Sequence, residues 1–107
     1  MTWQVGILNQ TVEREIAALP KDMQAKLLRI IGMIEQLGLE GMREPYVKHL
    51  RTSLWEMRMT GRDGIARAIY VTASGRRIVI VRAFRKKTQK TPRSEIELAL
   101  KRAEDLK

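Results

Sequence analysis

The sequence predicts an α+β fold, in which an antiparallel sheet is packed by an N-terminal helical hairpin and a C-terminal helix. Apolar residues recur at helical spacing from Pro20 to Gly38. Three strand-like runs joined by short turns follow between residues 54 and 84. This order of elements is typical of helices that cover an antiparallel sheet, and 107 residues suffice for a single domain over residues 1–107.

The N-terminal part is expected to form a short strand and two helices. Residues 3–7 alternate apolar and polar side chains, which favours a strand that joins the last strands across the sheet. Val12, Ile16 and Leu19 share one face of a short helix, and the proline after Leu19 ends it. The second helix, which a glycine would terminate, carries an apolar stripe formed by Met23, Leu27, Ile30, Ile31, Ile34 and Leu37.

The middle of the chain is expected to supply most of the sheet. Residues 39–52 are predicted to be a loop, because glycine and proline interrupt a mainly polar stretch. An antiparallel meander of three strands should then cover residues 54–60, 65–72 and 77–84. In its first strand, alternation separates Trp55, Met57 and Met59 from Glu56 and Arg58.

The last helix is predicted from its start signals. Pro92 suits a first helical position after Thr91, and Ser94 with Glu97 has the spacing of a capping box. The apolar stripe of this helix consists of Ile96, Ala99, Leu100 and Ala103.

The positive charge of the chain is unevenly distributed. The formal net charge is +9, and no acidic residue occurs between Asp63 and Glu95. That stretch holds nine basic residues: Arg67, Arg76, Arg77, Arg82, Arg85, Lys86, Lys87, Lys90 and Arg93. A concentration of one sign predicts a surface patch with an anionic partner, either nucleic acid or an acidic protein. A membrane surface is disfavoured, because the patch follows a strand and not an amphipathic helix.

Several kinds of catalytic and targeting signal are missing from the sequence. There is no cysteine, and His49 is the single histidine, so thiol chemistry, histidine pairs and multi-histidine zinc sites are excluded. No carboxylate cluster or glycine-rich phosphate loop suggests a metal or cofactor, so none is expected. The first residues do not resemble a signal peptide, and no apolar run is long enough to span a membrane; we expect a cytoplasmic protein.

The candidate site is a set of cations at strand ends. Arg58, Arg67 and the run that begins at Arg85 are expected to converge on neighbouring strands. Arg67 interrupts an apolar alternation, so it needs either an anionic ligand or a salt bridge to Glu56 on the adjacent strand. Glu56 is then either an ion-pair partner of these arginines or a general base, and pairing is the simpler interpretation.

Such a cluster is suited to RNA cleavage without a metal ion. RNA carries its own nucleophile, the 2′-hydroxyl beside each phosphate. Guanidinium groups match phosphate oxygens, and a lysine crowded by other cations has a lowered pKa that suits proton transfer.

Four motifs in order resemble the signature of RelE/HigB-type toxins, in particular their phage-derived HigB-like branch. These are Leu54-Trp55-Glu56-Met57-Arg58, Arg67-Ala68-Ile69-Tyr70, the run from Phe84 to Pro92, and Glu95-Ile96 with Ala99. The resemblance implies a RelE-like fold and cofactor-independent cleavage of mRNA on the ribosome. It implies catalytic roles for Arg58, Arg67, Lys86 and Lys87, of which Arg67 would stabilise the scissile phosphate. The expected RNA-binding residues around them are Lys48, Arg85, Lys90 and Arg93.

The resemblance also implies partners, and it leaves alternatives open. A cognate antitoxin, of the helix-turn-helix type, is expected to cover the basic patch, and mRNA with the ribosome would be the target. The alternatives are a non-catalytic inhibitor of DNA gyrase on the same fold, like ParE-type toxins, and a plain basic nucleic-acid-binding protein. Trp3 and Trp55 are expected in the core, His49 in a solvated loop, and Tyr70 either packed or stacked on a base.

Overall fold

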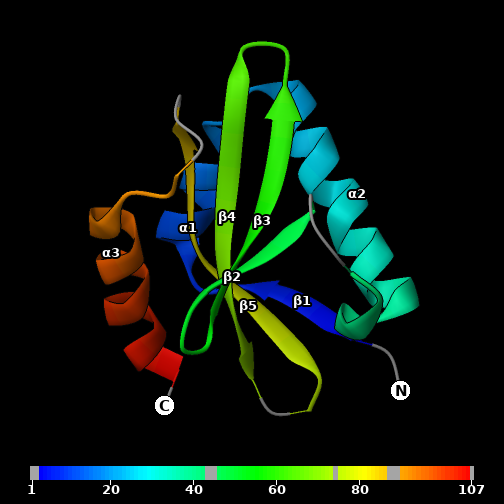
Figure 1. Cartoon of the computed structure of the whole chain (residues 1–107), viewed down its shortest axis with the longest axis vertical. Coiled ribbons are helices and arrows are strands. Elements are labelled where there is room, and N and C mark those ends of the chain that lie inside the picture. Colours follow the sequence, from blue (N-terminus) through cyan, green and yellow to red (C-terminus); the bar gives the residue numbers. More distant parts are fainter. Residues whose placement is uncertain (1–2, 43–45, 74, 87–89, 107) are drawn as a thin grey trace.

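The computed structural model confirms the α+β class and describes residues 3–42, 46–73, 75–86 and 90–106, with the side chain of Lys86 outside that description (Figure 1). The strands are β1 (Gln4–Ile7), β2 (Val47–Arg51), β3 (Leu54–Gly61), β4 (Gly64–Ala73) and β5 (Arg77–Lys86). The α-helices are α1 (Gln10–Ala17), α2 (Lys21–Leu37) and α3 (Arg93–Ala103), with short 3-10 turns at Leu39–Gly41 and Glu104–Leu106.

The sheet has five strands in the order β1-β5-β4-β3-β2, and it differs from the prediction in two respects. β1 runs parallel to β5, so the sheet is mixed and not purely antiparallel. The predicted loop over residues 39–52 contains β2, an edge strand antiparallel to β3. β2 escaped the alternation pattern because its sequence is short and polar, and only its first residue, Val47, is buried.

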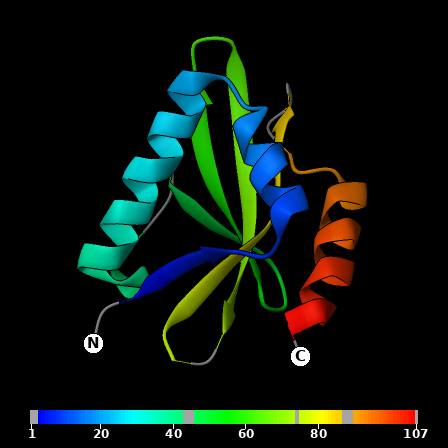
Figure 2. The same cartoon turned by 180° about the vertical axis from the view of Figure 1, so that it is seen from behind.

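Helices cover both faces of the sheet. α1 and α2 lie across one face (Figure 2), where Met23, Leu27 and Ile34 pack against Met57 and Met59. α3 lies against the other face, beside Leu54, Ile69, Val81 and Phe84, to which it contributes Ala99. The predicted helical hairpin is therefore confirmed. Because α3 occupies the second face, the polar side of β3 is also partly covered.

The two predicted helical patterns are formed with small differences at their ends. In α2 the stripe is buried at Met23, Leu27, Ile30 and Ile34, but Leu37 is 64% exposed, so its assignment to the stripe was wrong. α3 begins at Arg93, and its cap position has no side-chain hydrogen bond, so the predicted capping box is not formed. The hydroxyl of Thr91 is used elsewhere, in the site described below. No helix in the described part of the chain is long and apolar enough to cross a membrane.

The register of the central strands decides which side chains share a face. Arg58 on β3 is paired with Arg67 on β4, and Arg67 is paired with Phe84 on β5. Opposite residues in paired strands point to the same side of the sheet. A register shift then follows on β5, where Ile69 pairs with Arg82 but Tyr70 pairs with Ile80. The skipped Val81 therefore lies on the α3 side together with Arg82.

Candidate active site

Two arginines and one glutamate form the centre of the site, on the α3 side of the sheet. Arg58 and Arg67 occupy directly opposite positions of β3 and β4. Both approach Oε2 of Glu56: Arg67 donates a short hydrogen bond through its Nη1, and Nε of Arg58 lies 3.5 Å away. The alternative of an ion pair between Arg67 and Glu56 is thereby confirmed. We call these three residues the Glu56 cluster.

The Glu56 carboxylate is fully engaged in this cluster. Its side chain is 1% exposed, and its second oxygen, Oε1, accepts a hydrogen bond from the hydroxyl of Thr91. Both oxygens of the carboxylate are therefore bound by other side chains, and the group is buried away from the surface that a substrate would reach. The geometry therefore favours pairing over a general-base role for Glu56.

The two arginines differ in access to solvent. The side chain of Arg58 is 20% exposed, whereas Arg67 is 1% exposed. The three members of the Glu56 cluster together carry two positive charges and one negative charge. Arg58 reaches the surface, and Arg67 lies behind it.

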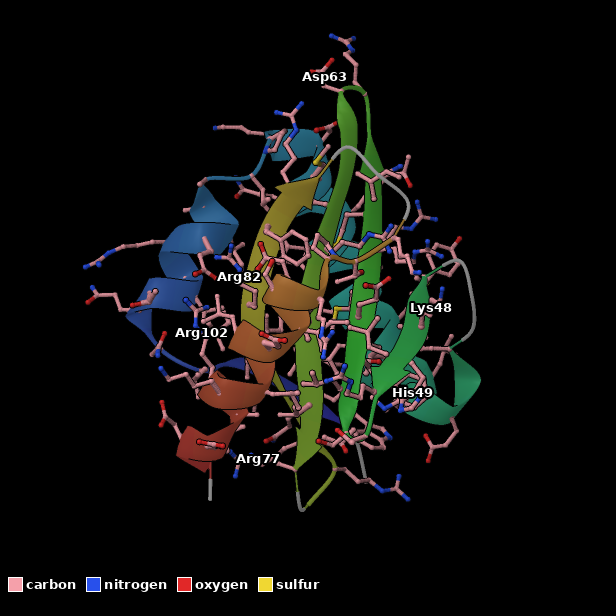
Figure 3. The ribbon with its side chains drawn as sticks, turned by 60° about the vertical axis from the view of Figure 1, so that its left-hand side comes forward. Lys48, His49, Asp63, Arg77, Arg82 and Arg102 are labelled. Carbon is pink, nitrogen blue, oxygen red and sulfur yellow. The ribbon has the colours of Figure 1, made fainter. Side chains whose placement is uncertain are left out.

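Several of the predicted RNA-binding residues surround the cluster. Lys48 is exposed on β2, opposite Glu56 and therefore on the same face of the sheet (Figure 3). Beyond Thr91, an open depression is lined by Arg51, Lys90, Thr91, Pro92, Arg93 and Ile96. Arg93 is exposed and forms an ion pair of 3.2 Å with Glu97. Lys86 has its backbone opposite Ile65 at the end of β5, and Lys87 lies outside the described residues.

The acid-free stretch does not form one surface patch, contrary to its appearance in the sequence. Arg85 is paired with Ala66, a residue of the α1–α2 side, and it donates to the carbonyl oxygen of Asp63 at 2.6 Å. Figure 3 places Asp63 and Arg77 at opposite ends of the sheet. An extended strand separates its residues by about 3.3 Å each, so a run of cations along β5 spreads over the length of the molecule.

Arg82 belongs to a second ionic cluster beside α3. It donates to both carboxylate oxygens of Glu95, at 2.7 and 3.1 Å, and lies 2.8 Å from Oε2 of Glu15. Arg102 also pairs with Glu15, at 2.8 Å. We call Glu15, Arg82, Glu95 and Arg102 the α1–α3 network, because it connects those helices through β5 (Figure 3). Two acids and two bases leave it without excess charge.

The network shifts the pKa of two of its members. Burial tends to raise the pKa of Glu15, but hydrogen bonds from Arg102 and from the backbone of Ala83, together with the charge of Arg82, hold it below its usual value. The hydrogen bonds from Arg82 to Glu95 raise the pKa of Arg82. Arg82 is therefore engaged in structure and is not offered to a ligand.

The remaining aromatic residues and the histidine have structural surroundings. Tyr70 is 0% exposed within the core, which rules out base stacking in this structure, and burial raises the pKa of its hydroxyl. Trp55 packs against the same core and contacts the ring of His49 at 4.8 Å between centroids. His49 lies on β2 and not in a loop, and its Nε2 is 2.8 Å from the carbonyl oxygen of Thr52.

In the described part of the chain, no three His, Asp or Glu side chains are grouped closely enough to hold a metal ion.

Thr91 is the member of the site that the sequence did not reveal. Its place before Pro92 suggested helix capping, whereas its hydroxyl instead binds Glu56, 35 residues away in sequence. The signal available was only its position at the end of the basic run. Such a long-range contact depends on how α3 docks on the sheet, which no local pattern encodes.

Comparison with known proteins identifies the family to which this chain belongs. Residues 14–104 match the family model described as Phage derived protein Gp49-like (DUF891), and the chain therefore belongs to that family. Together with the two solved structures described next, this match confirms the predicted relationship to RelE-like type II toxins at the level of family and fold. A comparison with curated proteins gives no significant match.

Two solved structures have similar folds. The E. coli toxin RelE, in the free state and with two arginines replaced by alanine, aligns with a TM-score of 0.67 at 12% identity, over 95% of this chain and 98% of that one. The archaeal RelE–RelB complex from Pyrococcus horikoshii aligns with a TM-score of 0.58 at 26% identity, over 79% of this chain and 96% of that one.

Proposed function

We propose that this protein is the toxin of a type II toxin–antitoxin pair, acting in the cytoplasm as an endoribonuclease that cleaves ribosome-bound mRNA without a cofactor. The observation that carries the proposal is the Glu56 cluster. Two arginines on neighbouring strands share one buried carboxylate, and the more exposed of them, Arg58, reaches the surface. A fixed guanidinium of this kind suits the phosphate of a transition state, where negative charge increases.

The proposed reaction is transfer of the scissile phosphate to the neighbouring 2′-oxygen, with departure of the 5′-oxygen. Arg58 binds a nonbridging phosphate oxygen. Arg67 holds Glu56 behind Arg58. Its direct contact with phosphate stays a prediction, because its side chain is 1% exposed. Lys86 and Lys87 are proposed to assist proton transfer at the end of β5.

The surrounding cations are proposed to bind the RNA and to meet the antitoxin. Lys48, Lys90 and Arg93 would hold RNA phosphates on the face of the Glu56 cluster, while a role for Arg85 stays a prediction. The archaeal relative was solved in complex with RelB, and this supports a cognate antitoxin here. We propose an antitoxin of the helix-turn-helix type whose acidic or amphipathic segment covers this face, with an affinity that falls as salt rises.

The test is to map RNA ends after addition of the purified protein to translating ribosomes. New 5′ ends within the translated mRNA are expected with the wild-type protein and not with Arg58→Gln. Inhibition of DNA supercoiling by gyrase, without any RNA cleavage, would instead support the ParE-type alternative. Binding of RNA with neither cleavage nor gyrase inhibition would reduce the protein to a nucleic-acid binder.

A further inference from the structure

A groove lies next to the Glu56 cluster, between α2 and the outer edge of β3. It is lined by Lys26, Arg29, Ile30, Met33, Tyr46, Arg58 and Thr60. β2 pairs with β3 only as far as Met57, so within the described chain no strand covers the edge of β3 beyond that residue. A hydrogen bond of 2.9 Å from the Arg58 backbone to the Tyr46 carbonyl places Tyr46 at this edge. We call this feature the α2–β3 groove.

The chemistry of the groove combines an apolar floor with cations at its rim. Ile30 and Met33 of α2 supply apolar surface, and Tyr46, a residue that is 46% exposed, supplies an aromatic ring. Lys26 and Arg29, one helical turn apart on α2, supply positive charge, and no carboxylate lines the groove among the described residues. A flat apolar ring attached to phosphate is a ligand that uses all of these features.

Arg58 belongs to both the groove and the cluster. Its guanidinium is 3.5 Å from the Glu56 carboxylate, and its side chain also lines the groove. An RNA strand whose phosphate is bound at Arg58 must continue to a neighbouring nucleotide on either side. Because Arg58 itself lines the α2–β3 groove, the groove is within reach of one of these neighbouring nucleotides.

We propose that the α2–β3 groove binds the nucleotide next to the scissile phosphate, with its base against Tyr46 and its phosphate near Lys26 and Arg29. The inference rests on the proposed ribonuclease function and adds a second subsite to it. The groove volume of about 250 Å³ lies just below the usual range for drug-sized ligands, which suits a single base. Contacts with one ring face and with phosphates make this subsite tolerant of sequence.

An acidic peptide segment is the competing occupant, since it would also satisfy the cations. The observations favour RNA, because the groove is continuous with the phosphate-binding arginine and contains an exposed aromatic ring. An acidic peptide would need only the positive charges, and neither the neighbouring arginine nor the aromatic ring. The two occupants predict different responses to substitution of Tyr46.

The test measures binding of a short single-stranded RNA, methylated at every 2′-oxygen to prevent cleavage, by fluorescence anisotropy with the full-length protein. Tyr46→Ala is expected to weaken binding by about tenfold, the effect of losing one stacked base, while Tyr46→Phe retains the wild-type affinity. The double variant Lys26→Gln/Arg29→Gln should flatten the dependence of log affinity on log salt by about 0.7, for the loss of one phosphate contact on a single strand. Leu28→Ala and Lys101→Gln, at exposed positions outside the groove, are the matched controls and should match wild type.

The same variants are compared in mRNA cleavage on ribosomes, where a raised KM with a nearly unchanged kcat is expected for Tyr46→Ala. The cleavage assay on ribosomes also detects a role of the groove in RNA binding that occurs only on the ribosome. Wild-type values for Tyr46→Ala in both assays, with cleavage intact, would overturn the proposed nucleotide binding in the groove. The proposed ribonuclease function would remain. A wild-type protein that neither binds nor cleaves RNA would overturn the function itself. Polyglutamate serves as a probe for an acidic peptide in the same anisotropy assay. If Lys26→Gln/Arg29→Gln loses binding of polyglutamate but retains binding of RNA, the groove belongs to an acidic partner.

Discussion

The described part of the chain contains two arginine–glutamate clusters, which differ in stoichiometry and in burial. The α1–α3 network pairs two arginines with two glutamates, and each acid is bound by hydrogen bonds of 2.7 to 3.1 Å. The Glu56 cluster pairs two arginines with one buried glutamate, and Arg58 reaches the surface. The same residue types therefore connect two helices in one place and join two strands beside the surface in the other.

The difference lies in stoichiometry and burial and not in residue type. A balanced, partly exposed network stabilises the packing of helices at little electrostatic cost. A buried cluster is costly, because Arg67 and Glu56 lose water and a second positive charge lies nearby. Under the proposed function, Arg58 of this cluster binds the phosphate of RNA. The predictions below test that separation.

The largest expected effect is on stability, after removal of the shared carboxylate. Glu56→Ala leaves Arg67 buried without its counter-charge, and we expect a loss of about 3 to 5 kcal/mol in the free energy of unfolding. Glu95→Ala, the matched change in the α1–α3 network, should cost about 1 to 2 kcal/mol, since its partner is more exposed. Urea denaturation measures both. Equal losses would mean that burial does not distinguish the two clusters.

Arg58→Gln is expected to have the next largest effect, and on activity. Loss of one fixed donor to the developing phosphate charge should lower kcat/KM by about 100-fold or more, with little change in stability. Arg82→Gln is the matched variant, and the opposite result is expected: lower stability with nearly unchanged activity per folded molecule. Cleavage rates and thermal melts of the two variants separate these outcomes. A similar activity loss in both would contradict the assignment of the site to the Glu56 cluster.

Thr91→Val tests the contact between the basic segment and the sheet. Removal of the hydroxyl leaves Oε1 of Glu56 without its donor, and we expect a loss of about 1 to 2 kcal/mol in the free energy of unfolding. Thr91→Ser keeps the hydroxyl and should retain most of the stability. If the serine variant is as unstable as the valine variant, the methyl group and not the hydrogen bond supports the segment.

The contrast also shows what the sequence was able to predict. The helical stripe of α2 and the three central strands were predictable, because each repeats a local period over many residues. Glu56 and Arg58 were assigned to one face of β3 by alternation alone. The partner of Arg67 remained open between a ligand and Glu56, since the choice depends on a register between strands that local sequence does not specify.

The fate of Arg82 was not predictable for a related reason. A register shift on β5 directs Arg82 to the α3 side next to Val81, where two glutamates from separate helices reach it. In a linear sequence Arg82 stands inside an acid-free stretch. Its acids are supplied by Glu15 and Glu95, from elements that come together only after folding. The parallel pairing of β1 with β5 was hidden in the same way, because strand direction is a property of the assembled sheet.

The smallest expected effect is a pH dependence of the α1–α3 network. The folded-state pKa of Glu15 is lower than its unfolded value near 4.5, so its contribution to stability is present above that pH and is lost as the pH falls through the folded value. We therefore expect the melting temperature of the wild-type protein to fall more steeply below about pH 4.5 than that of Glu15→Gln, which lacks the titrating group. Glu13→Gln, at an exposed position of the same helix, is the control and should follow the wild-type profile. Parallel profiles for Glu15→Gln and wild type would show that the network does not hold the ionised carboxylate. The electrostatic distinction between the two clusters would then rest on the Glu56 cluster alone.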